Sequence, residues 1–336
     1  MNKIKILNES DINKILNMNI AIEAVENAYK QKSNLKGNVW PLVFYEYEHN
    51  IFDLDIRSGN LVDSNAYGLK LISYNENNTQ LGLNKVNATS LICDDKTGRL
   101  IAMLNAAPIT SYRTGAAAGI GAKYLARKNS ENLLVVGSGN IAVYSIVATL
   151  ITMSSIKKIV ICNPKDYNSL LGKIDKLKNK IEELLSECNL SLQAEIECTS
   201  DLGKSVKMSD IIITATPSEK AMIECSWVKQ GTHFSCMGAC MENKQEIDEI
   251  IFSKARVYAD DINQCIKSGE SQTAFKQGII SDFNGEIGDV MLNKENGRIS
   301  DEDITIFDST GLFIQDLATS IEILNNSENI GIEVDL

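Results

Sequence analysis

The sequence predicts an α/β protein: a doubly wound, Rossmann-type parallel sheet together with an α+β domain. Two observations indicate this fold class. From Leu133 onward, short apolar strands alternate with long helical segments, which is typical of a parallel sheet with helices on both faces. The first of these strands runs into Gly137–Ala142, a GxGxxA turn of the kind that opens dinucleotide-binding domains.

The N-terminal third has a different pattern. Residues 1–35 predict two short helices, the first capped by Ser10 or Asp11. Strand-like segments fill residues 40–105. An Ala/Gly-rich helix is expected from Thr110 to Arg127, and its small residues imply close packing against another element.

The remainder of the chain alternates regularly. Helices are expected at Val143–Met153, at Asp166–Glu187 and, as a closing element, at 311–326. The strands of the parallel sheet are expected near residues 133–137, 158–162, 192–198, 210–215, 232–237, 255–259 and 304–307.

The composition and charge of the chain exclude several classes of function. The 336 residues are 44% hydrophobic with a net charge of −11, and an acidic chain repels phosphate backbones, so no nucleic-acid partner is expected. No segment is apolar enough for a signal peptide or a membrane span, which predicts a cytoplasmic protein. The eight cysteines suit small buried side chains in a reducing compartment. His233, Cys236 and Cys240 lie close together but lack a fourth ligand, so no metal is expected.

The GxGxxA turn has the expected surroundings. Gly137 permits the tight turn, Gly139 lets the backbone approach a pyrophosphate, and Ala142 lets the helix pack on the strand. The first-turn N–H groups and the helix dipole then favour the phosphates. The alternative is a glycine-rich turn in an unrelated α/β fold.

The residues that follow two of the predicted strands indicate how a cofactor would bind and which one it would be. Asn163 stands where an acidic residue would hold the ribose of NAD, and Lys165 can attract a 2′-phosphate. This favours NADP slightly over NAD, unless Asp166 turns inward or Lys165 is only a solvated helix-start residue. The Thr214–Ser218 segment either lines the nicotinamide ribose or is a simple turn.

Short motifs in a fixed order make the chain resemble the ornithine cyclodeaminase/mu-crystallin family over nearly its whole length. They are Tyr67–Leu71, Asp94–Gly98, Ser111–Ala117, Ala122–Arg127, the GxGxxA turn, Gly231–His233, Gly238–Ala239, Lys244–Asp248 and Phe307–Gly311 with Gln315 and Asp316.

The resemblance implies a homodimeric, NAD(P)-dependent amino-acid enzyme. It implies a substrate and dimerisation domain of residues 1–115 with 311–336 around a Rossmann domain of residues 116–310. The cofactor contacts expected from the turn, the strand ends and the resemblance are Thr114, Gly137, Ser138, Gly139, Asn140, Ile141, Asn163, Pro164, Lys165, Thr214, Ala215, Thr216, Met237, Gly238, Ser309 and Gly311.

Three basic residues are expected to meet the substrate. Arg113, placed at a strand–helix junction, can grip a carboxylate bidentately, or instead pair with a structural acid. Lys70 lies in an apolar strand; the family's matching lysine is catalytic, whereas the alternative is an exposed lysine on the polar face. Arg57 can add a second anion contact, which suggests a substrate with two carboxylates.

The sequence also suggests interpretations for His233 and for the pair Ser309 and Thr310. His233 is expected to order its loop. Ser309 or Thr310 is either the N-cap of the last helix or, by resemblance, part of the loop beside the nicotinamide.

The function expected is hydride transfer at the α-carbon of a small α-amino or α-imino acid, as in ketimine reductases and amino-acid dehydrogenases. Ornithine cyclodeaminases usually carry an Asp where this chain has Cys240, and a thiol with an ordinary pKa of about 8.5 lacks that permanent charge. Two alternatives stay open: an ornithine cyclodeaminase that recycles NAD, and a non-catalytic NADP-dependent binding protein of crystallin type.

Overall fold

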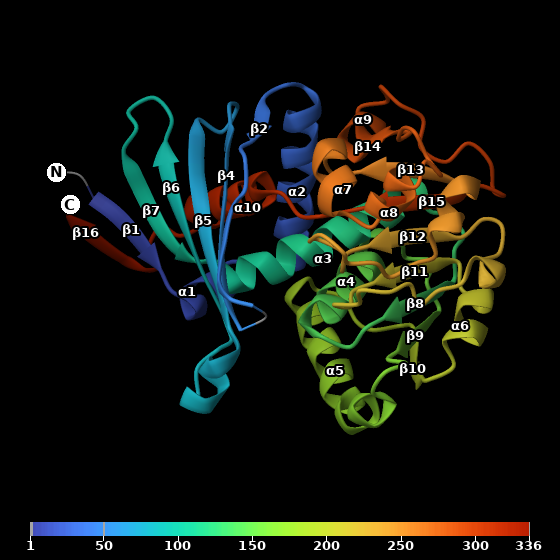
Figure 1. The fold of residues 1–336 in the computed structure, drawn as a ribbon. Helices are drawn as coiled ribbons and strands as arrows, with labels where there is room; N and C mark the ends of the chain where they lie inside the picture. Colours follow the sequence, from blue (N-terminus) through green and yellow to red (C-terminus); the bar gives the residue numbers. More distant parts are fainter. Residues whose placement is uncertain (1–2, 50, 336) are drawn as a thin grey trace. The chain divides into compact units, whose positions relative to one another are not determined.

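The computed structural model describes residues 3–49 and 51–335, which form two compact units (Figure 1). The first unit contains the chain up to Arg113 and again from Leu312 onward. The second runs from Thr114 to Gly311. Helix α3 (Ala106–Leu125) contributes its first residues to the first unit and the rest to the second.

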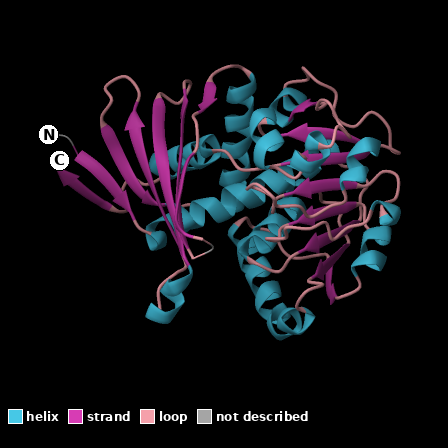
Figure 2. Cartoon of the chain, viewed as in Figure 1, coloured by secondary structure: helices cyan, strands magenta, loops and turns pink. Residues whose placement is uncertain are grey.

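The first unit is built on a mixed sheet (Figure 2), whose neighbouring strands are antiparallel except for the parallel pair β1 and β7. Helix α10 (Phe313–Asn325) packs against β4, β5 and α2 (Met18–Ser33), so the end of the chain completes the core of its beginning. The strand order is β16 (Ile332–Asp335), β1 (Lys3–Leu7), β7 (Leu100–Asn105), β6 (Val86–Asp94), β5 (Ala66–Asn75), β4 (Phe52–Leu61) and β2 (Gly37–Val39), with β3 (Val43–Glu48) paired to β4.

A pair of glycines lets α10 approach the sheet. Gly59 on β4 and Gly68 on β5 are directly opposite each other. A Cβ on Gly68 would lie 3.3 Å from the ring of Phe313, and a Cβ on Gly59 would lie 3.4 Å from Ile314. The same added atoms would lie 2.3 Å from backbone oxygens of the adjoining strands, so these positions leave no room for a side chain.

The second unit contains a parallel sheet, in agreement with the predicted Rossmann class. The sheet order reverses between β8 and β11, the switch point at which open α/β sheets bind ligands. In order, the strands are β10 (Glu195–Thr199), β9 (Lys158–Cys162), β8 (Asn132–Val136), β11 (Ile211–Thr214), β12 (His233–Cys236), β15 (Ile304–Asp308), β13 (Ala255–Ala259) and β14 (Gly285–Glu286).

Helices and 3₁₀ turns join these strands. The small residues of α3 pack as predicted: Cβ atoms on Gly115 and Gly119 would lie 2.5 and 2.7 Å from the backbone of Tyr144 and Ala148 on α4. The connecting elements of this unit are α4 (Asn140–Thr152), α5 (Tyr167–Glu187), α6 (Leu202–Met208), α7 (Ile262–Ser268), α8 (Gln272–Lys276), α9 (Ile287–Met291), η2 (Cys225–Trp227) and η3 (Glu249–Lys254).

Several predicted boundaries were wrong near the N-terminus. A strand, β1, precedes the two helices because it pairs with β7 and β16, partners about 100 and 330 residues away. The cap of α1 (Glu9–Asn13) is Asn8, not Ser10 or Asp11. Asn8 accepts from the Asp11 N–H, and the Asp11 carboxylate accepts from the Asn8 N–H, which makes a capping box.

Two predicted helices begin earlier than expected. Helix α3 starts at Ala106, one turn before Thr110, because the Asn105 side chain accepts from the Ala107 N–H and Pro108 is tolerated in a first turn. Helix α4 starts at Asn140, inside the GxGxxA turn, rather than at Val143. Among the described residues, no helix is both long enough and apolar enough to cross a bilayer.

Candidate active site

Lys70 is completely buried in the first unit. It sits on β5, and its Nζ lies 2.7 Å from Asp316 Oδ1 and 3.2 Å from Thr110 Oγ1. Leu71, the next residue, points to the opposite face and is 43% exposed. The alternative of an exposed lysine on the polar face was therefore wrong, because period-two alternation places Lys70 under α10.

Arg113 lies on the other side of the same carboxylate. Its Nε is 3.4 Å from Asp316 Oδ2, and its Nη1 donates to Gln315 Oε1 at 3.3 Å. Gln315 is itself fixed, because its Oε1 accepts from the Leu312 N–H and its Nε2 donates to the Tyr29 hydroxyl. Asp316 Oδ2 and Arg113 Nε are buried and lack a hydrogen bond within the described structure.

The position of Arg113 differs from the prediction. It lies seven residues inside α3, not at a strand–helix junction, because the helix already begins at Ala106. Its side chain pairs with the acid Asp316, the counter-ion of Lys70, as the structural alternative expected, whereas its contact with a substrate carboxylate stays a prediction.

Burial and charge set the pKa values of this cluster. Burial, together with the charges of Arg113 and Arg57, lowers the pKa of Lys70 to about 8, although Asp316 opposes the shift. Burial alone would raise the pKa of Asp316, but Lys70 and Arg113 outweigh it and lower that pKa below its ordinary value. Lys70 is therefore still mainly protonated at pH 7 but loses its proton more readily than an ordinary lysine, while Asp316 stays ionised.

The cluster carries one positive charge in excess. Asp316 neutralises one of its two cationic neighbours, and Arg57, opposite Lys70 on β4, is paired with Asp55 at 3.3 Å. A buried, uncompensated cation is unfavourable unless an anion joins it. The surplus charge beside Lys70 and Arg113 therefore suits a ligand carboxylate.

In the second unit, the glycine turn has the geometry of a phosphate cradle. Gly137 has a φ of 116°, and a Cβ there would lie 2.5 Å from the Ala215 carbonyl oxygen at the end of β11. Gly139 is exposed, with open space where a Cβ would stand, and no side chain caps the start of α4 there. The first-turn N–H groups of α4 can thus donate hydrogen bonds to an anion.

The end of β9 is tied to this turn. Asn163 Nδ2 donates to Ser138 Oγ at 3.2 Å, and Asn163 Oδ1 accepts from the Asp166 N–H. Asp166 does not turn inward; it caps α5 by accepting from the Ser169 N–H. Lys165 Nζ lies 3.4 Å from Ser218 Oγ, and the contact of Asn163 and Lys165 with a ribose stays a prediction.

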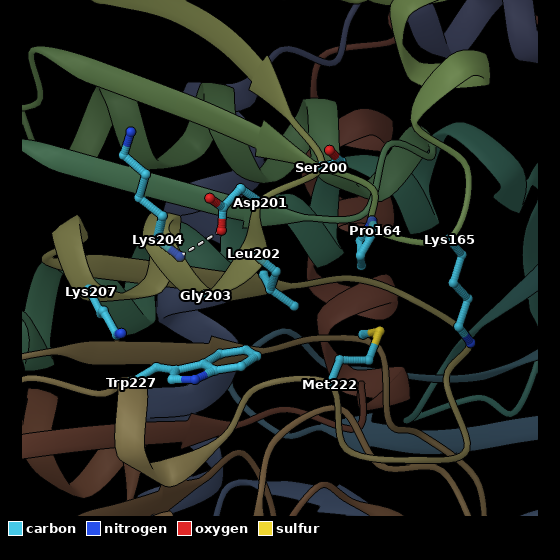
Figure 3. A pocket seen from close by; sticks show the side chains of 10 residues that line it. All are labelled: Pro164, Lys165, Ser200, Asp201, Leu202, Gly203, Lys204, Lys207, Met222 and Trp227. Carbon is cyan, nitrogen blue, oxygen red and sulfur yellow. Dashed lines mark hydrogen bonds between the residues drawn. The ribbon is translucent and has the colours of Figure 1, made fainter.

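A pocket of about 770 Å³ opens beside the same strand end (Figure 3). Lys165 stands on one side and Lys207 on the other, with Met222 and the indole of Trp227 between them (Figure 3). The lining combines aromatic and apolar surface with ammonium groups, which suits a flat ring that carries a phosphate. Its other lining residues are Pro164, Ser200, Asp201, Leu202, Gly203 and Lys204.

In the same unit, the N-cap alternative for Ser309 and Thr310 and the loop role expected of His233 were wrong, whereas the cofactor contact expected of Ser309 stays a prediction. Ser309 and Thr310 do not cap a helix; both hydroxyls donate to the buried carboxylate of Asp260. His233 orders no loop: it is the first residue of β12, and its ring bonds Thr305 and Ser235 in the core. Within the described ranges, no group of three His, Cys, Asp or Glu residues could hold a metal ion.

Sequence reasoning missed the acids that organise both sites. Asp316, Asp260 and Glu246 were assigned no role, yet each anchors predicted ligand-binding residues. Two signals were available: Gln315 and Asp316 interrupt the apolar start of the last helix, where buried polar residues are bonded, and Asp316 and Glu246 fall within the motifs of the resemblance.

The comparisons with known proteins agree with this architecture. The model of the "Ornithine cyclodeaminase/mu-crystallin family" matches residues 2–330. An alanine dehydrogenase from Archaeoglobus fulgidus is 34% identical over 98% of this chain and 97% of its own length.

Solved structures match along the whole length as well. An archaeal structure described as an alanine dehydrogenase dimer with bound NAD superposes with a TM-score of 0.86, at 32% identity and 99% coverage of both chains. The iminosuccinate reductase of Paracoccus denitrificans in complex with NAD⁺ gives a TM-score of 0.88, at 26% identity, over 99% of this chain and all of that one.

The role of Asp316 is testable by titration. In Asp316→Asn, Lys70 loses its counter-ion but keeps the neighbouring guanidinium groups, so the pKa of Lys70 is expected to fall below its present value of about 8. The variant should also be less stable by roughly 3–5 kcal/mol, because an ion pair is broken inside the protein.

Carbon-detected NMR of the lysine Cε–Nζ groups measures the pKa, and urea unfolding measures the stability. Glu333→Gln, which removes the exposed partner of Lys3, is the control and should leave Lys70 unchanged. An unaltered Lys70 titration in Asp316→Asn would show that Asp316 is not its counter-ion.

Proposed function

The chain belongs to the ornithine cyclodeaminase/mu-crystallin family, and we propose that it is an NAD(P)-dependent oxidoreductase acting at the α-carbon of a small α-amino or α-imino acid. The observation that carries this proposal is the buried Lys70–Asp316–Arg113 cluster with its surplus positive charge. Such a cluster supplies both a carboxylate anchor and a proton-exchanging amine, the two groups that the chemistry of an amino acid requires.

We assign Arg113 to bind the substrate carboxylate. Its guanidinium is held by Gln315 and Asp316, so it is oriented before a ligand arrives. We assign Lys70 to donate or accept the proton that accompanies hydride transfer. Its pKa of about 8 leaves both protonation states accessible near neutral pH, so it can donate a proton to an imine nitrogen or accept one from an amine.

The residues of the glycine turn fit a dinucleotide, which supplies the hydride acceptor or donor when bound. Oxidation of an amino acid removes a hydride from the α-carbon and a proton from the nitrogen. A bound nicotinamide dinucleotide would accept the hydride, and Lys70 would take the proton. The names of the two relatives, alanine dehydrogenase and iminosuccinate reductase, describe this class of reaction in its two directions.

A substrate panel with single substitutions tests the assignment. α-Keto acids with ammonia, cyclic imines, imino acids with one or two carboxylates, and ornithine are assayed with each oxidised and reduced cofactor. Lys70→Met should lower kcat by about 10²- to 10⁴-fold, the range expected for loss of a general acid or base. Arg113→Ala should mainly raise KM for the acid, by about 10- to 100-fold for one charged hydrogen bond.

Lys36→Met is the control, because Lys36 is an exposed lysine of the same unit paired with Asp63. Undiminished turnover in Lys70→Met would refute its role. Product formation without net change in cofactor absorbance would identify a cyclodeaminase instead. An advantage for substrates with two carboxylates, lost in Arg57→Ala, would support the second anion contact proposed for Arg57.

We also propose that NADP is preferred over NAD. Asn163 is neutral where NAD enzymes place an acid, and Lys165 lies at the rim of the pocket with Lys207 opposite (Figure 3). Lys165→Ala should weaken NADPH binding about tenfold, equivalent to ~1.4 kcal/mol, and leave NADH binding unchanged. Fluorescence titration measures both constants, with Lys176→Ala on the exposed side of α5 as control. Equal losses for the two cofactors would refute a 2′-phosphate contact.

The proposed assembly is a homodimer that uses the sheet face of the first unit opposite Lys70. Cross-strand neighbours Val43, Ile56 and Leu71 form an apolar row on that face, continued by Tyr45 and Leu54. Val43, Tyr45 and Leu71 are 55%, 57% and 43% exposed, which is unusual for a contiguous apolar surface unless it meets a partner. One solved neighbour is itself described as a dimer.

Charge on this face should prevent association. Leu71→Asp is expected to give monomers in sedimentation velocity experiments at concentrations where the unmodified protein is dimeric, because an aspartate would be buried without a partner. Leu171→Asp is the matched control, since Leu171 on α5 is 45% exposed and lies in the other unit. A Leu71→Asp protein that stays dimeric would place the interface elsewhere.

A further inference from the structure

Glu246 is a buried acid bonded to two different loops of the second unit. Its Oε1 accepts from the Thr216 N–H and from the Thr216 hydroxyl, both at 2.7 Å. Its Oε2 accepts from the Gly238 N–H at 3.0 Å. Thr216 follows β11 and Gly238 follows β12, so one carboxylate joins the carboxyl ends of two neighbouring strands.

These bonds also fix where the opposite carbonyls point. The described peptides contain no cis bond, and in a planar trans peptide the C=O points away from the N–H. Because the Thr216 N–H points at Glu246, the Ala215 carbonyl must point away from it. It does so toward the glycine turn, where a Cβ on Gly137 would meet the Ala215 oxygen at 2.5 Å.

The same reasoning applies to the second loop. The Gly238 N–H points at Glu246, so the Met237 carbonyl is turned away from the buried acid. Gly238 must be a glycine for this approach, because a Cβ there would lie 2.4 Å from both Glu246 Oε2 and the Thr216 carbonyl oxygen. Glu246 thereby sets the orientation of one peptide on each of two adjacent loops.

The position of Glu246 is itself fixed by further hydrogen bonds. Its backbone N–H and that of Ile247 donate to Glu270 Oε1, both at 2.7 Å, and its carbonyl accepts from the Met222 N–H. Glu270 in turn donates its N–H to Asp308 Oδ1 on β15. The bonded chain therefore runs from the β11 loop through Glu246 and Glu270 to the end of β15.

We propose that Glu246 is a positioning residue for the dinucleotide: it fixes the peptides 215–216 and 237–238 so that the Ala215 and Met237 carbonyls stand ready for the cofactor. The inference rests on the proposed function, since it assigns the β11 and β12 loops to the cofactor. It differs from a purely structural role, because a core acid that only stabilises the fold would affect stability and not cofactor affinity.

The electrostatics are consistent with an acid that is held in place for its hydrogen bonds. Burial raises the pKa of Glu246 to about 7, although the bonds from Thr216 and Gly238 oppose the shift. Burial and the nearby charge of Glu246 raise the pKa of Glu270 well above its ordinary value. Retaining two such acids next to each other is unfavourable, and the peptide geometry above supplies a reason for it.

Glu246→Gln is the test variant. It keeps the shape, but whichever way the amide is turned, its NH₂ group faces the Thr216 or the Gly238 N–H, and two donors repel. We expect the Kd for NADPH or NADH to rise about 10- to 100-fold, while KM for the amino or imino acid at saturating cofactor changes little. Fluorescence titration and steady-state kinetics measure the two effects.

Two control variants separate an effect on cofactor positioning from an effect on protein stability. Glu242→Gln makes the same change at an exposed position of the same loop and should leave cofactor binding unaltered. Ile251→Val trims a fully buried side chain of the same unit and should lower the melting temperature without changing Kd. An unchanged Kd in a folded Glu246→Gln protein would overturn the proposal.

A measurement on the unmodified protein covers the case in which Glu246→Gln does not fold. Hydrogen–deuterium exchange of the cofactor-free protein should show the Thr216 and Gly238 amides strongly protected, and rapid exchange of either would also overturn the proposal. If the unmodified protein shows this protection but binds no pyridine nucleotide, the proposed function fails and the hydrogen bonds of Glu246 stand.

Discussion

The first unit depends on one buried carboxylate. Asp316 receives a lysine from β5 and an arginine from α3, and it stands on α10, which the chain reaches only after the whole second unit. Without Asp316, two cations would be buried side by side. The ion pairs therefore select the docked position of α10, and the glycines at 59 and 68 make that position sterically accessible.

Buried acids serve the two units in opposite ways. Asp316 meets two cationic side chains, Lys70 and Arg113, so its charge is retained and its pKa is lowered. Glu246 meets only neutral donors, so burial prevails and its pKa rises to about 7. The cluster around Asp316 has a net positive charge that attracts an anion. Glu246 instead makes directional hydrogen bonds that hold backbone N–H groups in place. The proposed attraction of the substrate anion and the proposed orientation of the cofactor therefore depend on different chemistry.

The predictable parts of this structure were those set by neighbours in sequence. The GxGxxA turn, the strand at 255–259 and the helix expected at Asp166–Glu187 follow from local pattern. The unpredicted parts depend on remote partners. β1 exists because β7 and β16 pair with it, and Ser309 bonds Asp260, about 50 residues away, instead of capping a helix. The sequence marks Lys70 as a candidate, but only the docking of α10 shows that its side chain is buried.

The surplus charge beside Lys70 links substrate binding to protonation. With Arg113 nearby and no ligand carboxylate, Lys70 has a pKa of about 8. A carboxylate held by Arg113 cancels the repulsion between the two cations, so the pKa of Lys70 must rise when the anion binds. At neutral pH the occupied site then favours the ammonium form. A lysine with a pKa of about 8 is already mainly protonated at pH 7, and a bound carboxylate reinforces this form, which is the one that the proposed proton donation to an imine requires.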